Sequence, residues 1–68
     1  MKRVSVFPNI YAECARENIS QEQLAARLGV NVKTLYNWHA GATPIPSTAV
    51  IAMARMWNVT TDYILSQT

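Results

Sequence analysis

The 68-residue sequence has one cysteine, one histidine and only two glycines. Cys14 has no partner for an intramolecular disulfide, and no group of cysteines and histidines has the spacing of a zinc site. The chain also lacks a Gly-rich phosphate loop, paired carboxylates and an activated nucleophile. We therefore expect no metal, no cofactor and no small-molecule substrate, and the sequence argues against an enzyme.

Charge and long apolar runs are also scarce. Six basic and four acidic residues give a net charge of +2, which is too small to establish nucleic-acid binding by itself. The longest apolar stretch, 45–57, is interrupted by Arg55 and is too short for a membrane span. The apolar stretch 4–7 is too short for a signal peptide. We expect one small cytoplasmic domain over residues 1–68, because this length allows only one core.

The segment 20–41 has the pattern of two short helices joined by a tight turn. Ser20 and Gln23 have the spacing of a capping box, which predicts the start of the first helix. Gly29 follows the last apolar residue of that helix, where a left-handed residue ends a helix and redirects the chain. Asn31 is a suitable cap for a second helix over residues 32–39. The segment therefore predicts a helix-turn-helix.

Three further helices are expected around this segment. Pro8 suits the first position of a helix over 8–17, and the proline-containing stretch 41–46 reads as a loop. Another helix should begin at residue 46 or 47, and Thr60 should cap a short last helix. The fold class is all-α, a compact five-helix bundle. Its apolar stripes predict a core that includes Cys14, Ala25, Leu28, Leu35, Trp38, Val50, Met53 and Trp57.

Two further expectations concern the ends of helices. His39 is interpreted as an exposed residue at a helix C-terminus, where cations are favoured, since no partner ligand is in view. Tyr63, Ile64 and Leu65 are adjacent and cannot all face one core, so part of this surface should be available to a partner.

The chain resembles the phage repressor and Cro family, the lambda-repressor-like or XRE-type helix-turn-helix domains. The matching residues are Gln21, Leu24, Ala25, Gly29, Leu35 and Trp38. The resemblance implies a sequence-specific transcriptional regulator, a repressor derived from a phage or mobile element. It also implies a homodimer that binds a palindromic operator in double-stranded DNA and inserts the helix 32–39 in the major groove.

The resemblance and the outward positions of that helix suggest residues that contact DNA. Base contacts are expected from Val32, Lys33, Tyr36 and Asn37, with Val32 departing from the family, which more often has a long polar residue there. Phosphate contacts are expected from Gln21, Thr34, Lys2 and Arg3. In the family, the residue at the position of Gln21 either holds a phosphate or braces the recognition helix. Residues 1–6 are expected to form a flexible arm, which either frays or brings Lys2 and Arg3 to the DNA.

Several alternatives stay open at this stage. The lesser alternative for Lys33 and Asn37 is that they are ordinary surface residues. Tyr36 can pack beside Trp38 or contact DNA, and Arg16 and Arg27 can be phosphate contacts or surface charges. A second function class is a helical protein-interaction module without DNA, such as the partner-binding domain of an antitoxin. The polar outward residues of helix 32–39 favour DNA, because a protein-binding surface more often presents large apolar anchors.

Overall fold

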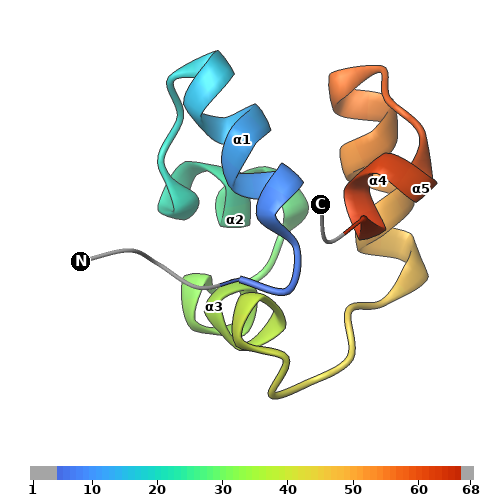
Figure 1. Cartoon of the computed structure of the whole chain (residues 1–68). Coiled ribbons are helices and arrows are strands. Elements are labelled where there is room, and N and C mark those ends of the chain that lie inside the picture. The colour runs from blue at the N-terminus through green and yellow to red at the C-terminus, as the bar shows by residue number, and fades with distance from the viewer. Residues whose placement is uncertain (1–4, 67–68) are drawn as a thin grey trace.

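The structure is a computed structural model that describes residues 5–66 of the chain. All regular structure in this range is helical (Figure 1), which confirms the all-α prediction. The five helices are α1 (Pro8–Glu17), α2 (Gln21–Leu28), α3 (Val32–Ala40), α4 (Ser47–Trp57) and α5 (Thr61–Leu65). None of these helices is both long and apolar enough to cross a membrane.

The helix boundaries follow from local capping chemistry. Ser20 Oγ accepts a hydrogen bond from the Gln23 amide at 3.1 Å, and Gln23 Oε1 accepts one from the Ser20 amide at 2.8 Å, so the predicted capping box is confirmed. Gly29 ends α2 with a φ of 71° in the left-handed region. The Asn31 side chain then caps α3 by accepting from the Lys33 amide. The turn between α2 and α3 is therefore encoded locally.

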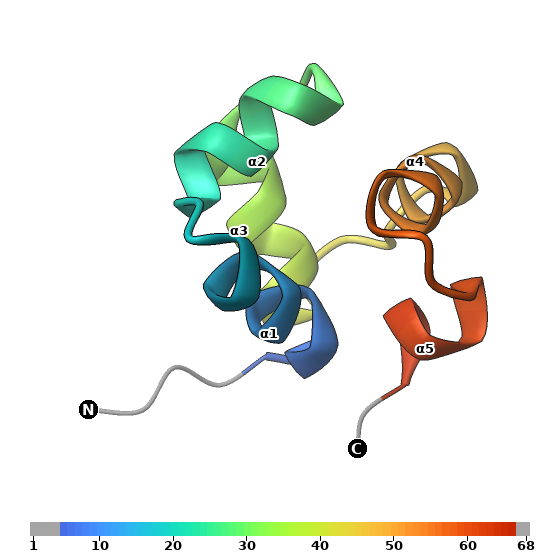
Figure 2. The ribbon, with the colours of Figure 1, turned by 90° about the horizontal axis from the view of Figure 1, so that it is seen from above.

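The helices enclose one core. The α2–α3 pair contacts α4 through α2, and α5 packs against both α4 and α1 (Figures 1 and 2). The largest fully buried side chains come from all five helices: Ile10, Leu24, Leu35, Met53 and Ile64. The core prediction is confirmed except at Leu28, which is only half-buried and packs against the edge of the core. Leu28 is the last residue of α2, so the chain turns away before that side chain is covered.

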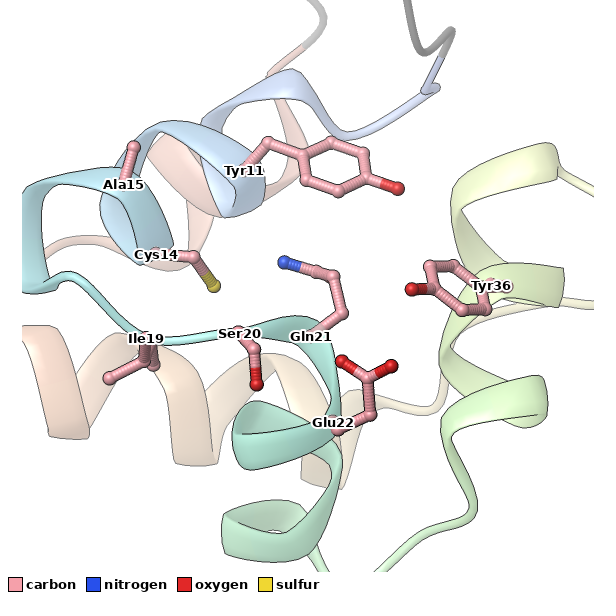
Figure 3. Close-up of a pocket in the computed structure, with 8 residues that line it drawn as sticks. All are labelled: Tyr11, Cys14, Ala15, Ile19, Ser20, Gln21, Glu22 and Tyr36. Carbon is pink, nitrogen blue, oxygen red and sulfur yellow. The ribbon is translucent and has the colours of Figure 1, made fainter.

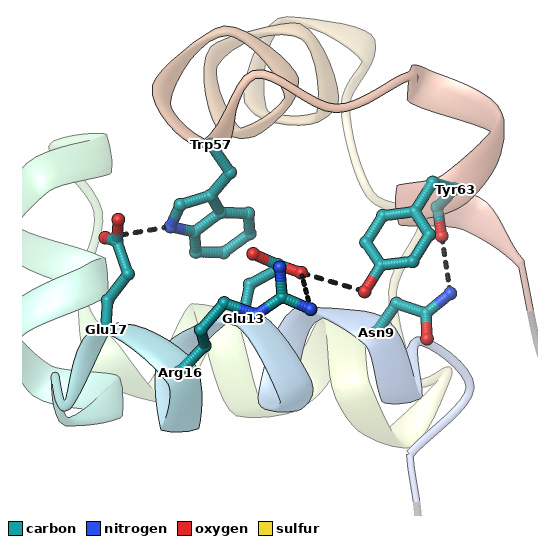
Figure 4. Close-up of polar contacts among 6 residues, drawn as sticks. All are labelled: Asn9, Glu13, Arg16, Glu17, Trp57 and Tyr63. Carbon is teal, nitrogen blue, oxygen red and sulfur yellow. Dashed lines mark hydrogen bonds and ion pairs between the residues drawn. The ribbon is translucent and has the colours of Figure 1, made fainter.

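A polar seam on α1 fixes the positions of α4 and α5 (Figure 4). The hydroxyl of Tyr63 in α5 donates to Oε2 of the buried Glu13 at 2.8 Å. The side-chain amide of Asn9 donates to the backbone carbonyl of Tyr63 at 2.8 Å. Trp57 at the end of α4 donates its indole N–H to Glu17 at 3.2 Å. These bonds satisfy polar groups at the edge of the core, where an unpaired carboxylate such as that of Glu13 would oppose folding.

We expect the free energy of unfolding of the Tyr63→Phe variant to differ most from that of the wild type below pH 10. The hydrogen bond to the Glu13 carboxylate raises the pKa of Tyr63 above its ordinary value of 10.0, and burial adds to this effect. The raised pKa stabilises the fold while the phenol is protonated in both states, and this contribution is lost as the pH rises through the higher folded pKa. Urea titrations from pH 8 to pH 12 should show the stability gap between wild type and Tyr63→Phe closing. A constant gap would contradict this role for Tyr63.

Candidate nucleic-acid interface

The outward face of α3 carries most of the predicted base-contact residues. Lys33 and Ala40 are exposed and Asn37 is half-buried, and their spacing places the three side chains along one side of the helix. Tyr36 is also half-buried beside this face. Val32 is half-buried but packs against the core, so less of its side chain is left for a thymine methyl group. The structure therefore brings Lys33, Tyr36 and Asn37 together, with Val32 at the margin.

The basic residues divide into paired and unpaired groups. Arg16 lies 3.5 Å from Glu13, and Arg27 lies 3.6 Å from Glu17 while its guanidinium also contacts the Met56 sulfur at 3.8 Å. Both arginines thus bind protein groups around α1. Within residues 5–66, Lys33 and Arg55 are the basic side chains without a carboxylate in ion-pair range. Lys33 is accordingly the basic residue that α3 offers to an anionic partner.

A hollow of about 380 Å³ lies between α1, the N-terminus of α2 and α3 (Figure 3). Gln21, the first residue of α2, is one of its walls, and Tyr11, Cys14 and Tyr36 are others. Burial raises the pKa of the Cys14 thiol, and the Gln21 side chain opposes this shift as a hydrogen-bond partner. Cys14 is buried, as the sequence predicted, so it is a core residue with little thiolate character.

His39 was expected to be an exposed residue, and this expectation is wrong. Only 3% of His39 is exposed, because the side chain turns inward near the end of α3. Its ring stacks on Tyr11 of α1 with centroids 3.9 Å apart. The pattern did contain a signal, since His39 follows Val32 and Leu35 at helical spacing on the inward side of α3.

Two hydrogen bonds hold the His39 ring in place. Nε2 lies 2.9 Å from Gln21 Oε1, which can only accept, so Nε2 carries the proton and donates. Nδ1 lies 2.6 Å from Ser5 Oγ, which is a hydrogen-bond distance. Gln21 is therefore a brace between α2 and α3, one of the two roles that the resemblance suggested. Its phosphate contact stays a prediction, since its side-chain oxygen contacts His39 and its side chain is also a hydrogen-bond partner of the Cys14 thiol.

The start of the chain is attached to the end of α3. The Val6 amide donates to the His39 carbonyl at 2.9 Å, and Ser5 contacts the His39 ring. Ser5 and Val6 were included in the predicted arm, but the structure anchors both of them to α3. Lys2 and Arg3 lie outside the described residues, so their predicted phosphate contacts stay predictions.

Comparison with known protein families yields a match. A model of the helix-turn-helix family matches residues 10–64, which run from the third residue of α1 to the fourth residue of α5. Searches of curated proteins and of solved structures returned no match. The matched range covers most of the chain and contains α2, α3 and the hollow beside them.

Proposed function

Because this chain belongs to the lambda-repressor-like helix-turn-helix family of DNA-binding regulators, we propose that it recognises a specific operator by inserting α3 into the major groove. The single observation that carries this proposal is the outward face of α3, where the exposed Lys33 and the half-buried Asn37 lie on one side. A basic side chain can donate to guanine and an amide can pair with adenine, so this face offers the chemistry that base reading requires.

The phosphate contacts are proposed around this helix. The amides of Gln21 and Glu22 in the first turn of α2 have no acceptor within the described part of the chain. Such free amides attract anions, and the half-buried Thr34 lies in the first turn of α3. Gln21 and Thr34 would then position the protein on the DNA backbone, together with Lys2 and Arg3, whereas Val32, Lys33, Tyr36 and Asn37 would read bases.

The proposed active form is a homodimer on a palindromic operator. Ile51 of α4 and Leu65 of α5 are large apolar residues that are 43% and 44% exposed. Both line a groove of about 370 Å³ with Ile45 and Val50. A second copy related by a two-fold axis would cover this surface on both chains at once and would present two α3 helices to two half-sites. A repressor role and an origin in a phage or mobile element belong to the same proposal.

Selection of binding sites from random duplex DNA tests the proposal with the wild-type chain. We expect an inverted repeat, and sedimentation analysis should show a dimer on the selected duplex. A dimer that neutralises about four to six phosphates should give a slope of about −4 to −5 in a plot of log affinity against log salt. Selection of no sequence at all, or a flat salt response, would favour the alternative of a helical protein-interaction module.

A further inference from the structure

The hollow between α1, α2 and α3 is lined by a carboxylate and two phenols. Figure 3 shows the hydroxyl groups of Tyr11 and Tyr36 and the carboxylate of Glu22 pointing into it from three different helices. In the described part of the chain, no basic side chain lines the hollow and no ion pair involves Glu22, whereas Glu13 and Glu17 each lie near an arginine. The hollow therefore offers one negative charge and several acceptor oxygens to a cation that can donate hydrogen bonds.

The start of the described chain is fixed beside this hollow. Ser5 Oγ lies 2.6 Å from Nδ1 of His39, and the Val6 amide donates to the His39 carbonyl. The same imidazole ring stacks on Tyr11 and bonds to Gln21, which are two walls of the hollow. A single side chain, that of His39, therefore separates Ser5 from the hollow.

The four residues before Ser5 lie outside the described residues, and they include Lys2 and Arg3. Arg3 is two residues from Ser5, which is a span of about 7 Å in an extended chain. An extended chain also places side chains two residues apart on the same side, here the side on which Ser5 meets His39. A guanidinium can donate two parallel hydrogen bonds to a carboxylate, which the ammonium of Lys2 cannot do. Arg3 thus combines the charge, the reach and the donor geometry that suit the hollow.

We propose that Arg3 docks in this hollow against the Glu22 carboxylate in the DNA-free chain, as an autoinhibitory contact, and leaves it for a DNA phosphate on operator binding. The docking goes beyond the proposed function, whereas the release rests on it. The first turn of α2 begins at the same hollow, and its amides without an acceptor attract phosphate. Glu22 and a phosphate therefore compete for one cation. Because Glu22 is exposed, the docked contact is weak enough for a phosphate to displace it.

Trypsin cleavage after Arg3 measures the docking in the full chain without DNA, because the protease must take the arginine side chain into its own pocket. We expect Glu22→Gln to raise the initial rate of this cleavage about threefold over wild type at low salt. The difference should close at about 1 M salt, where charge interactions are screened. Asp62→Asn is the matched control, since it removes the same charge from an exposed residue of α5 outside the hollow, and it should leave the rate unchanged.

Two further readings of the same digest separate the docking from its alternatives. Cleavage after Lys33, inside α3, reports opening of the fold and should be equal in wild type and Glu22→Gln. A rise of both cleavages by the same factor would assign the effect to the fold and overturn the docking, as would equal rates after Arg3 in wild type and Glu22→Gln at low salt. Protection that grows with protein concentration would place Arg3 of a second copy in the hollow and overturn the intramolecular contact.

The release step is tested on the selected operator with wild type, Arg3→Gln, Glu22→Gln and the double variant. We expect Arg3→Gln to weaken binding about threefold more in the Glu22→Gln background than in wild type, because Arg3 starts undocked there. Additive losses would overturn the release, while the trypsin rates still decide the docking. Failure of the wild-type chain to bind any selected duplex would overturn the proposed function and the release step, and would leave the docking standing.

Discussion

Replacing Leu35 by alanine should lower the free energy of unfolding by about 2–5 kcal/mol. Leu35 is 0% exposed and lies in the core on the inward side of α3. Deleting its branched end removes buried apolar surface and leaves a cavity that the neighbouring helices fill only in part. The total free energy of unfolding of a small domain is only about 5–15 kcal/mol, so this loss is a large share of it.

The matched control is Leu65→Ala, the same chemical change on a side chain that is 44% exposed. We expect it to cost less than about 1 kcal/mol, because much of Leu65 is in water in the folded chain as well. Both variants are measured by urea titration at equal protein concentration, since a dimer contact at Leu65 would add a concentration-dependent effect. Equal losses at Leu35 and Leu65 would contradict the placement of the core.

Replacing Asn37 or Lys33 by alanine should cost about 1–3 kcal/mol on the best operator and relax the preference at one position in each half-site. Base contacts specify sequence, so binding to unrelated DNA should change less, especially for the uncharged Asn37. Thr34→Ala should instead weaken binding to all sequences alike, because a phosphate contact carries no sequence information. A competition assay against all single-base changes of the operator measures both behaviours.

The matched control for Lys33→Ala is Arg55→Ala. Arg55 is exposed near the end of α4 and has no carboxylate partner within the described residues, so its removal changes the net charge equally. We expect Arg55→Ala to leave the base preferences unchanged and to cause only a modest, salt-dependent loss. Uniform losses across the library for both Asn37→Ala and Lys33→Ala would show that these side chains do not read bases.

The sequence by itself determined the helices and their ends, because these depend on contacts between residues close in the chain. The Ser20 and Gln23 capping box, the left-handed Gly29 and the Asn31 cap were all predicted from spacing and side-chain chemistry, and the structure confirms them. The apolar stripes likewise identified Leu35 and Met53 as core residues. The assignment of the family follows from the same local pattern, which the family match confirms over residues 10–64.

Only the tertiary structure decided where the polar groups near the core find their partners. The contact between Ser5 and His39 joins residues 34 positions apart, and that between Tyr63 and Glu13 joins residues 50 apart. No periodicity predicts such a pair, because it depends on how whole helices pack and not on the preferences of a segment. The packing of the helices therefore buried His39, for which the sequence had predicted an exposed position. It also made Gln21 a brace between α2 and α3 and paired Arg16 and Arg27 with carboxylates, roles that the sequence alone had left open.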